Sequence, residues 1–135
     1  MTDSQQPASA HHDHPPSYGV GVSAALRQPG RELREVIPDV YDGFRSLATA
    51  AFADGALERK AKELIALAIA VATRCDGCMA AHARGAWRAG ATEAEVAEAL
   101  GVCIQMMGGP GTVYAPRAFA AYREFAASSG STPTT

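Results

Sequence analysis

The longest apolar run in the chain extends from Leu64 to Thr73 and constrains the fold more than any other segment. It continues a charged stretch that begins at Leu57, so that residues 57–73 form one helical pattern whose second half is apolar nearly all round. A helix of that kind is buried among other elements. The run is too short for the roughly 20 residues that a membrane span requires. We therefore expect this helix to be central in a core, without a membrane partner.

Further helical patterns precede and follow this segment, separated by proline and glycine signals. Pro38 suits the first turn of a helix, and Gly90 suits a C-terminal cap. Thr92 with Glu95 matches a capping box. No segment alternates in the manner of a β-strand. The helices expected from these signals are residues 31–36, 38–53, 57–73, 76–89, about 92–107 and 110–127. The predicted fold class is an all-α, compact helical bundle.

Two of these patterns carry a clear apolar face. In residues 38–53 that face consists of Val40, Tyr41, Phe44, Leu47, Ala48 and Ala51. In the helix that follows Thr92, the residues expected to point inward are Val96, Leu100, Cys103, Ile104 and Met107. Cys103 stands alone among apolar residues, which favours a small core residue over a redox role.

The chain has 135 residues, about the size of one domain. Residues 1–22 form a leader of Pro, His, Ser and Gln that we expect to be disordered, with residues 18–22 docking as an extended strap. Residues 23–127 are predicted to form a single all-helical redox domain, and residues 128–135 a polar tail. The leader contains a cluster of His11, His12 and His14, for which a solvated tail is the main interpretation and a metal-binding role the alternative.

Composition and charge limit the kinds of partner that the chain is expected to bind. The formal net charge is −2 and the basic residues are scattered, so no nucleic-acid surface is expected. The N-terminus lacks a basic start followed by an apolar segment, which predicts no signal peptide and a cytoplasmic location. Hydrophobic residues make up 47% of the chain, but many are alanines, each of which buries little area. We therefore expect the domain to bury further surface against copies of itself.

The segment Cys75-Asp76-Gly77-Cys78 carries the candidate chemistry. Three cysteines are too few for a secreted disulfide framework, and a C-x-x-C inside a cell indicates redox chemistry or metal binding. Cys75 is expected at or just before a helix start, with Cys78 in the first turn. There the helix dipole and unpaired N–H groups favour a thiolate, the form that attacks a peroxide or a disulfide.

Two further residues complete this constellation. His82 follows Cys78 by four residues, so both lie on one helix face and the imidazole can accept the thiol proton. From Glu63 the chain climbs roughly 15 Å to the end of its helix, and after a reversal it descends about 10 Å to His82. The Glu63 carboxylate would then hold the imidazole directly or through one water, as the orienting group of a triad does.

These four residues predict a reversible dithiol centre that reduces small hydroperoxides or disulfides with a dithiol reductant and needs no other cofactor. An alternative uses the same thiols as half of a non-catalytic zinc site that staples an oligomer. In that case His82 would join them, together with Glu63 or Cys103. A thioredoxin-type origin is excluded, since that motif follows a strand in a βαβ unit.

From about Leu57 to Phe125 the chain resembles the carboxymuconolactone decarboxylase superfamily, specifically its alkylhydroperoxidase-D-like branch. The resemblance rests on KELIALAIAVATRCDGCMAAHARGAWRAGATEAEVAEAL and on MMGGPGTVYA. It implies an all-helical subunit assembled into homotrimers or homohexamers, with sites near subunit contacts. It also implies peroxidase activity through a dithiol, re-reduced in some members by a lipoyl-carrying protein. The residues that match the branch's pattern are Glu63, Cys75, Cys78 and His82.

One position departs from that pattern. Peroxidase members place a second histidine directly before the second cysteine, where this chain has Gly77. The resemblance therefore implies a shorter proton relay, with weaker activity or a different oxidant. The branch that names the superfamily decarboxylates a lactone without a cysteine pair. It is kept as a further alternative, under which both cysteines would be unexplained.

Overall fold

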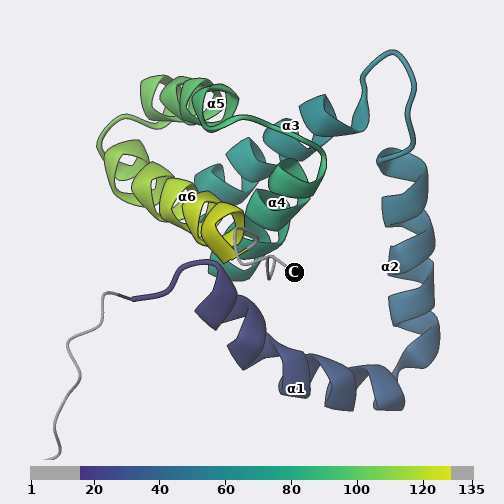
Figure 1. Cartoon of the computed structure of the whole chain (residues 1–135). Coiled ribbons are helices and arrows are strands. Elements are labelled where there is room, and N and C mark those ends of the chain that lie inside the picture. The colour runs from purple at the N-terminus through teal and green to yellow at the C-terminus, as the bar shows by residue number, and fades with distance from the viewer. Residues whose placement is uncertain (1–15, 129–135) are drawn as a thin grey trace, which may run out of the picture.

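The computed structural model describes residues 16–128, which form six α-helices and no strand (Figure 1). The helices are α1 (Val20–Val36), α2 (Pro38–Ala51), α3 (Arg59–Ala72), α4 (Asp76–Arg88), α5 (Glu93–Met107) and α6 (Gly109–Ser128). The predicted all-α fold is confirmed. Within residues 16–128, no helix combines the length and the apolar character needed to cross a membrane.

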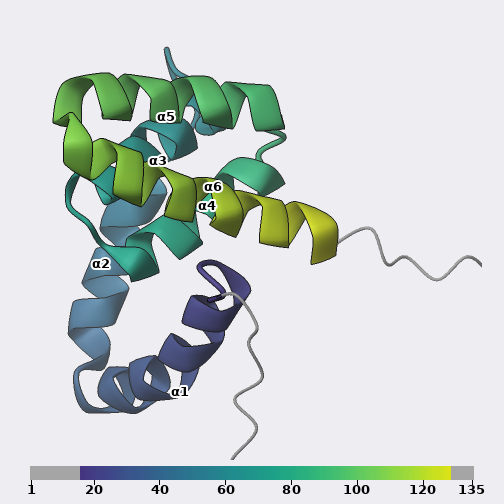
Figure 2. The same ribbon diagram turned by 90° about the vertical axis from the view of Figure 1, so that its left-hand side faces the viewer.

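Helices α3 to α6 pack together and hold the hydrophobic core (Figure 1, Figure 2). Leu67 and Val71 of α3 are fully buried, so one side of this helix lies in the core as expected. Its opposite side is not covered by the described chain, because Ile65 and Ile69 are 49% and 57% exposed. Alanines from three of these helices are also buried: Ala70, Ala83, Ala86, Ala118 and Ala121. Their small side chains let the helices approach closely while burying little area each.

The turn from α3 to α4 fixes where the cysteine motif begins. Arg74 has a φ of 57°, its N–H donates to the carbonyl of Val71, and the N–H of Cys75 donates to the carbonyl of Ala70. These two bonds form a Schellman motif, which usually carries glycine at the position that Arg74 occupies. Because α3 ends in this motif, the next residue, Cys75, is already the N-cap of α4. The predicted reversal is confirmed.

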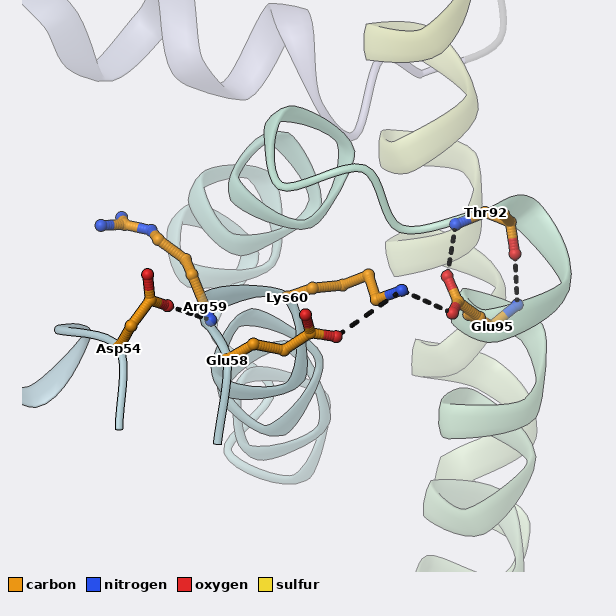
Figure 3. A network of polar contacts seen from close by, with 6 residues as sticks. All are labelled: Asp54, Glu58, Arg59, Lys60, Thr92 and Glu95. Atoms are coloured by element: carbon orange, nitrogen blue, oxygen red, sulfur yellow. Dashed lines mark hydrogen bonds and ion pairs between the residues drawn. The ribbon is translucent and has the colours of Figure 1, made fainter. Parts of the chain in front are cut away.

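A polar network ties the start of α3 to the start of α5 (Figure 3). Thr92 and Glu95 form the predicted capping box, with bonds of 2.8 Å and 3.2 Å. The ammonium of Lys60 lies 2.9 Å from Oε1 of Glu95. On the other side of α3, Oδ1 of Asp54 accepts the backbone N–H of Arg59 at 2.9 Å. These contacts hold the first turn of α3, one turn before Glu63.

Helices α1 and α2, which we call the arm, extend away from the core (Figure 1, Figure 2). Neither helix contains a buried residue. The apolar face predicted for residues 38–53 exists, but Val40, Phe44 and Leu47 are 65%, 69% and 66% exposed. The predicted face is therefore present, and the described chain leaves it largely uncovered. Periodicity identified the face, but it could not identify what covers the face.

The N-terminal predictions need two further corrections. The helix expected over residues 31–36 begins at Val20 and contains Pro29, although proline disfavours a helix interior. Residues 18–22 are not an extended strap, because Glu124 of α6 accepts the backbone N–H groups of Tyr18, Gly19 and Val20 and so starts α1 there. The predicted leader boundary at residue 22 thus falls inside a helix. Residues 1–15, with the histidine cluster, and residues 129–135 lie outside the described residues.

Candidate functional site

The two cysteines of the motif lie at the N-terminus of α4, as predicted. Cys75 is the N-cap, and its Sγ accepts the backbone N–H of Cys78 at 3.2 Å. The two residues are joined by a disulfide. Cys78 is exposed and Cys75 is half-buried. Cys78 is therefore the cysteine of the pair that is more accessible to solvent, and Cys75 is the more covered one.

Glu63 and His82 meet directly. Oε2 of Glu63 lies 2.9 Å from Nδ1 of His82, which confirms the contact expected from the heights of the two helices. The Glu63 side chain is buried, with 4% exposed, whereas that of His82 is 30% exposed. A neutral imidazole that donates from Nδ1 to a carboxylate keeps its lone pair on Nε2. This arrangement leaves Nε2 of His82 as the proton acceptor.

Arg59 is a second partner of the buried carboxylate. Its Nη2 lies 3.0 Å from Oε1 of Glu63. A buried carboxylate is strongly destabilising unless it is paired, and here both of its oxygens have a partner. Sequence reasoning did not assign this role to Arg59. The available signal was the spacing of four residues within one helix, which brings the two side chains together.

Gly85 makes room for the Glu63 carboxylate. A Cβ added at Gly85 would lie 2.3 Å from Oε2 and 2.5 Å from Cδ of Glu63, distances that no real contact reaches. Only glycine fits at this position without moving the carboxylate away from His82. This residue was also missed. Its signal was a glycine inside an otherwise helical pattern, which is less stable than alanine by about 1 kcal/mol and suggests a packing reason.

Phe52, directly after α2, stacks on the imidazole. The ring centroids of Phe52 and His82 are 5.6 Å apart and the planes differ by 10°. The guanidinium carbon of Arg59 lies 5.3 Å from the centroid of the same phenyl ring. No local sequence signal predicts this contact, since Phe52 is separated from the cysteine motif by the whole of α3. The end of the arm is thus part of the site.

Two cavities flank His82 and Phe52, and both residues line each of them. The smaller cavity, about 220 Å³, also contains Cys78, and its other lining residues are Ala66, Ile69, Ala70 and Thr73. The larger, about 740 Å³, lies on the Glu63 side, between the end of α2, the start of α3 and α4. A small molecule in the first cavity would contact both the exposed sulfur and the imidazole.

Gly77 is covered by the arm. A Cβ at this position would lie 2.9 Å from Cδ1 of Leu26 in α1. A larger side chain in place of Gly77 would therefore require Leu26 to move. Gly77 stands where the resemblance would put a second relay histidine, and at this position α1 packs closely on α4.

Cys103 does not join the other two cysteines. It is buried in α5, and its Sγ donates to the carbonyl of Ala68 at 3.7 Å. Burial raises the pKa of the Cys103 thiol. The core position predicted for it is confirmed. Within residues 16–128, no three His, Cys, Asp or Glu side chains are grouped so that they could hold a metal ion.

Comparisons with known proteins place the chain among related sequences. Residues 38–124 match the sequence profile of the carboxymuconolactone decarboxylase family. Uncharacterized protein 4 in the cox locus of Paracoccus denitrificans is 41% identical over 103 residues, which are 76% of this chain and 89% of that protein. An uncharacterized protein of Cupriavidus necator is 42% identical over 88 residues, 65% of this chain and 78% of that protein.

A solved structure agrees with these matches. It is the apo form of a carboxymuconolactone decarboxylase family protein from Legionella pneumophila, with a TM-score of 0.75 and 41% identity. The similarity covers 78% of this chain and 94% of that one.

Proposed function

The chain belongs to the carboxymuconolactone decarboxylase family, and we propose that it is a thiol-dependent peroxidase or disulfide reductase. One observation carries this proposal. A disulfide between Cys75 and Cys78 lies at a helix N-terminus, beside an imidazole that a buried Glu63 orients. Helix N-termini and adjacent imidazoles favour thiolates, and thiolates carry out this chemistry.

The catalytic cycle starts from the reduced dithiol. Nε2 of His82 takes the thiol proton of Cys78, and the Glu63 carboxylate stabilises the resulting imidazolium. The Cys78 thiolate attacks the hydroperoxide and takes its terminal OH as a sulfenic acid, while the O–O bond breaks. The leaving alkoxide receives the proton from His82 and departs as an alcohol.

Closure of the disulfide completes the oxidation. The sulfur of Cys75 attacks the sulfenic acid of Cys78, the S–S bond forms, and the hydroxyl leaves as water with the thiol proton of Cys75. A dithiol reductant then exchanges with the disulfide and restores both thiols. In total, one hydroperoxide and one external dithiol give one alcohol, one water and one external disulfide. A lipoyl-carrying protein is the proposed source of that dithiol. With a disulfide substrate, the same thiolate would act by exchange.

The proposed assembly is a homotrimer or homohexamer. Its support is the apolar face of the arm, where Val40, Phe44 and Leu47 are exposed, together with Ile65 and Ile69 of α3. An exposed patch of this kind on a small domain marks an interaction surface.

The test is peroxide consumption with a dithiol reductant. Cys78→Ser should lower the rate by about a thousandfold or more, since serine cannot form the sulfenic acid. Cys103→Ser is the matched control and should retain activity. Intact mass of the wild type should fall by two hydrogens per chain on treatment with stoichiometric peroxide. A Cys78→Ser variant that consumes peroxide at the wild-type rate would contradict the proposal.

Lactone decarboxylation is the second candidate, favoured by the family match alone. It needs neither cysteine. A double replacement of Cys75 and Cys78 by serine that keeps full activity toward a carboxylated lactone would establish it in place of the dithiol mechanism.

A further inference from the structure

We infer that the larger cavity beside Glu63 is a subsite for the acidic group of the substrate, so that the preferred oxidant is an organic hydroperoxide that carries a carboxylate. This inference rests on the proposed function, because it assigns the oxidant of the same site. Its basis is the charge of the residues around that cavity and the position of the cavity relative to Cys78.

Basic residues outnumber acidic ones around the cavity. The basic lining residues are Arg45, Arg59, Lys60, Arg84 and Arg88, and the acidic ones are Asp54, Glu58 and Glu63. Two of the basic groups are already neutralised. Arg59 pairs with Glu63 at 3.0 Å. Lys60 lies 2.9 Å from Glu95 and 3.8 Å from Glu58.

The three remaining arginines have weak partners or none in the part of the chain that the structure describes. Arg45 lies 3.3 Å from Asp42, but both side chains are more than 60% exposed, and such pairs contribute little. Arg84 lies 6.0 Å from the centroid of the Phe125 ring. Within residues 16–128, no carboxylate is within 4.0 Å of Arg84 or Arg88. The cavity thus holds uncompensated positive charge.

The spacing of Arg84 and Arg88 also points to an anion. They are four residues apart on α4, and like charges at that spacing destabilise a helix by a few tenths of a kcal/mol. An anion between them would remove this repulsion. Arg45 reaches the same cavity from α2, so the positive charge comes from two separate elements. The planar guanidinium group matches a carboxylate with two parallel hydrogen bonds.

The position of the cavity connects this charge to the chemistry. Phe52 and His82 line both cavities, so the larger one adjoins the one that contains Cys78 across this stacked pair. The Cys78 cavity is otherwise lined mainly by apolar side chains such as Ala66 and Ile69. A molecule with its peroxide at Cys78 and an apolar body along Phe52 would place a distant carboxylate among the arginines.

The first experiment compares two oxidants that differ mainly in charge. These are linoleic acid hydroperoxide and its methyl ester, which replaces the carboxylate charge by one methyl group; both are used below the concentration at which they form micelles, with a dithiol reductant. The wild type should show a kcat/KM about tenfold higher for the acid, which corresponds to a pair of charged hydrogen bonds. In the double variant Arg84→Gln/Arg88→Gln the acid-to-ester ratio should fall toward one, and Arg88→Lys should keep part of the preference.

A matched control removes the same charge elsewhere. Arg27→Gln/Arg31→Gln changes two exposed arginines of α1 that do not line either cavity, and it should keep the wild-type acid-to-ester ratio. An equal loss of the ratio in this control would show a general charge effect and overturn the subsite. A wild-type ratio near one would also overturn it.

A binding measurement separates this inference from the proposed function. Calorimetric titration of dodecanoate into the oxidised protein requires no turnover, and Arg84→Gln/Arg88→Gln should weaken binding by about tenfold. Binding that is lost in this variant, in a protein that consumes no peroxide, would support the acid subsite and contradict the peroxidase. Peroxide turnover without dodecanoate binding would support the peroxidase and contradict the subsite.

Discussion

The core and the arm differ in what their apolar faces contact, although the sequence pattern is similar in both. In the core, Leu67, Val71 and Val96 are fully buried. In the arm, Phe44 and Leu47 also lie on one face of a helix, yet they are more than 60% exposed. Amphipathic periodicity therefore shows that a helix has an apolar face, but it does not show whether that face packs within its own chain.

The arm nevertheless contributes to the site at its two ends. At one end, Glu124 accepts the backbone N–H of Val20 at the start of α1, and Leu26 of α1 packs against Gly77. At the other end Phe52 stacks on His82. Between them, the middle of the arm has no buried contact in the described chain. A segment without a core of its own is thus positioned by a few polar, apolar and aromatic contacts with the core.

The largest expected effect is a difference in stability between two leucine truncations. Leu67→Ala removes a fully buried side chain and should lower the free energy of unfolding by about 2–5 kcal/mol. In protein dilute enough for the proposed oligomer to dissociate, Leu47→Ala removes a side chain that is 66% exposed and should change this free energy by about 0.5 kcal/mol or less. Urea denaturation of both variants measures the difference. An equal loss for Leu47→Ala would mean that the face of the arm is buried against another chain under those conditions.

The second prediction tests that face directly. Phe44→Glu places a charge in the middle of the apolar face and should raise the dissociation constant of the proposed oligomer by about a hundredfold. Ser46→Glu adds the same charge on another side of α2 and is the control. Light scattering over a dilution series gives the association state. An unchanged assembly in Phe44→Glu would exclude this face as the interface.

The third prediction compares glycines in the core and in the arm. Gly85→Ala would force the Glu63 carboxylate to move and should lower kcat/KM for peroxide by about tenfold. Gly43→Ala in α2 meets no atom within 4 Å, so it should leave activity unchanged and stabilise the arm by about 0.4–1 kcal/mol. Steady-state kinetics with thermal unfolding separates the two effects. Full activity in Gly85→Ala would show that the contact between Glu63 and His82 is not needed.

The smallest effect concerns the contact that starts α1. Burial raises the pKa of Glu124, but the hydrogen bonds from Ser17 and from three backbone N–H groups lower it more, so the net pKa lies below the ordinary value. A carboxylate with a lowered pKa stabilises the fold above its unfolded-state pKa, and this contribution is lost as the pH falls through the folded-state pKa.

The wild type should therefore exceed Glu124→Gln in stability at neutral pH by less than about 1 kcal/mol, since solvent screens this contact. The difference should disappear in acid. Thermal unfolding of both proteins between neutral pH and the acid range measures it. A difference that does not change with pH would show that the charge of Glu124 has no part in holding α1.

Local signals predicted much of the core. The cap at Gly90 and the capping box at Thr92 follow from backbone hydrogen bonds within a few residues, and short sequences encode such bonds. The contact between Glu63 and His82 was also predictable, because the rise of two helices joined by a tight turn fixes their relative height. The sequence by itself therefore determined the helices of the core, the place of the two cysteines and the imidazole–carboxylate pair.

Only the tertiary structure decided the remaining features. The start of α1 depends on Glu124, more than a hundred residues along the chain from the N–H groups it accepts. The stacking of Phe52 on His82 and the close approach of Glu63 to Gly85 depend on how separate helices pack. Periodicity and capping describe residues that are neighbours along one helix. These contacts instead join segments far apart in the sequence, and their sequence separation does not predict their distance in space. For the same reason, the sequence showed the apolar face of α2 but not its exposure.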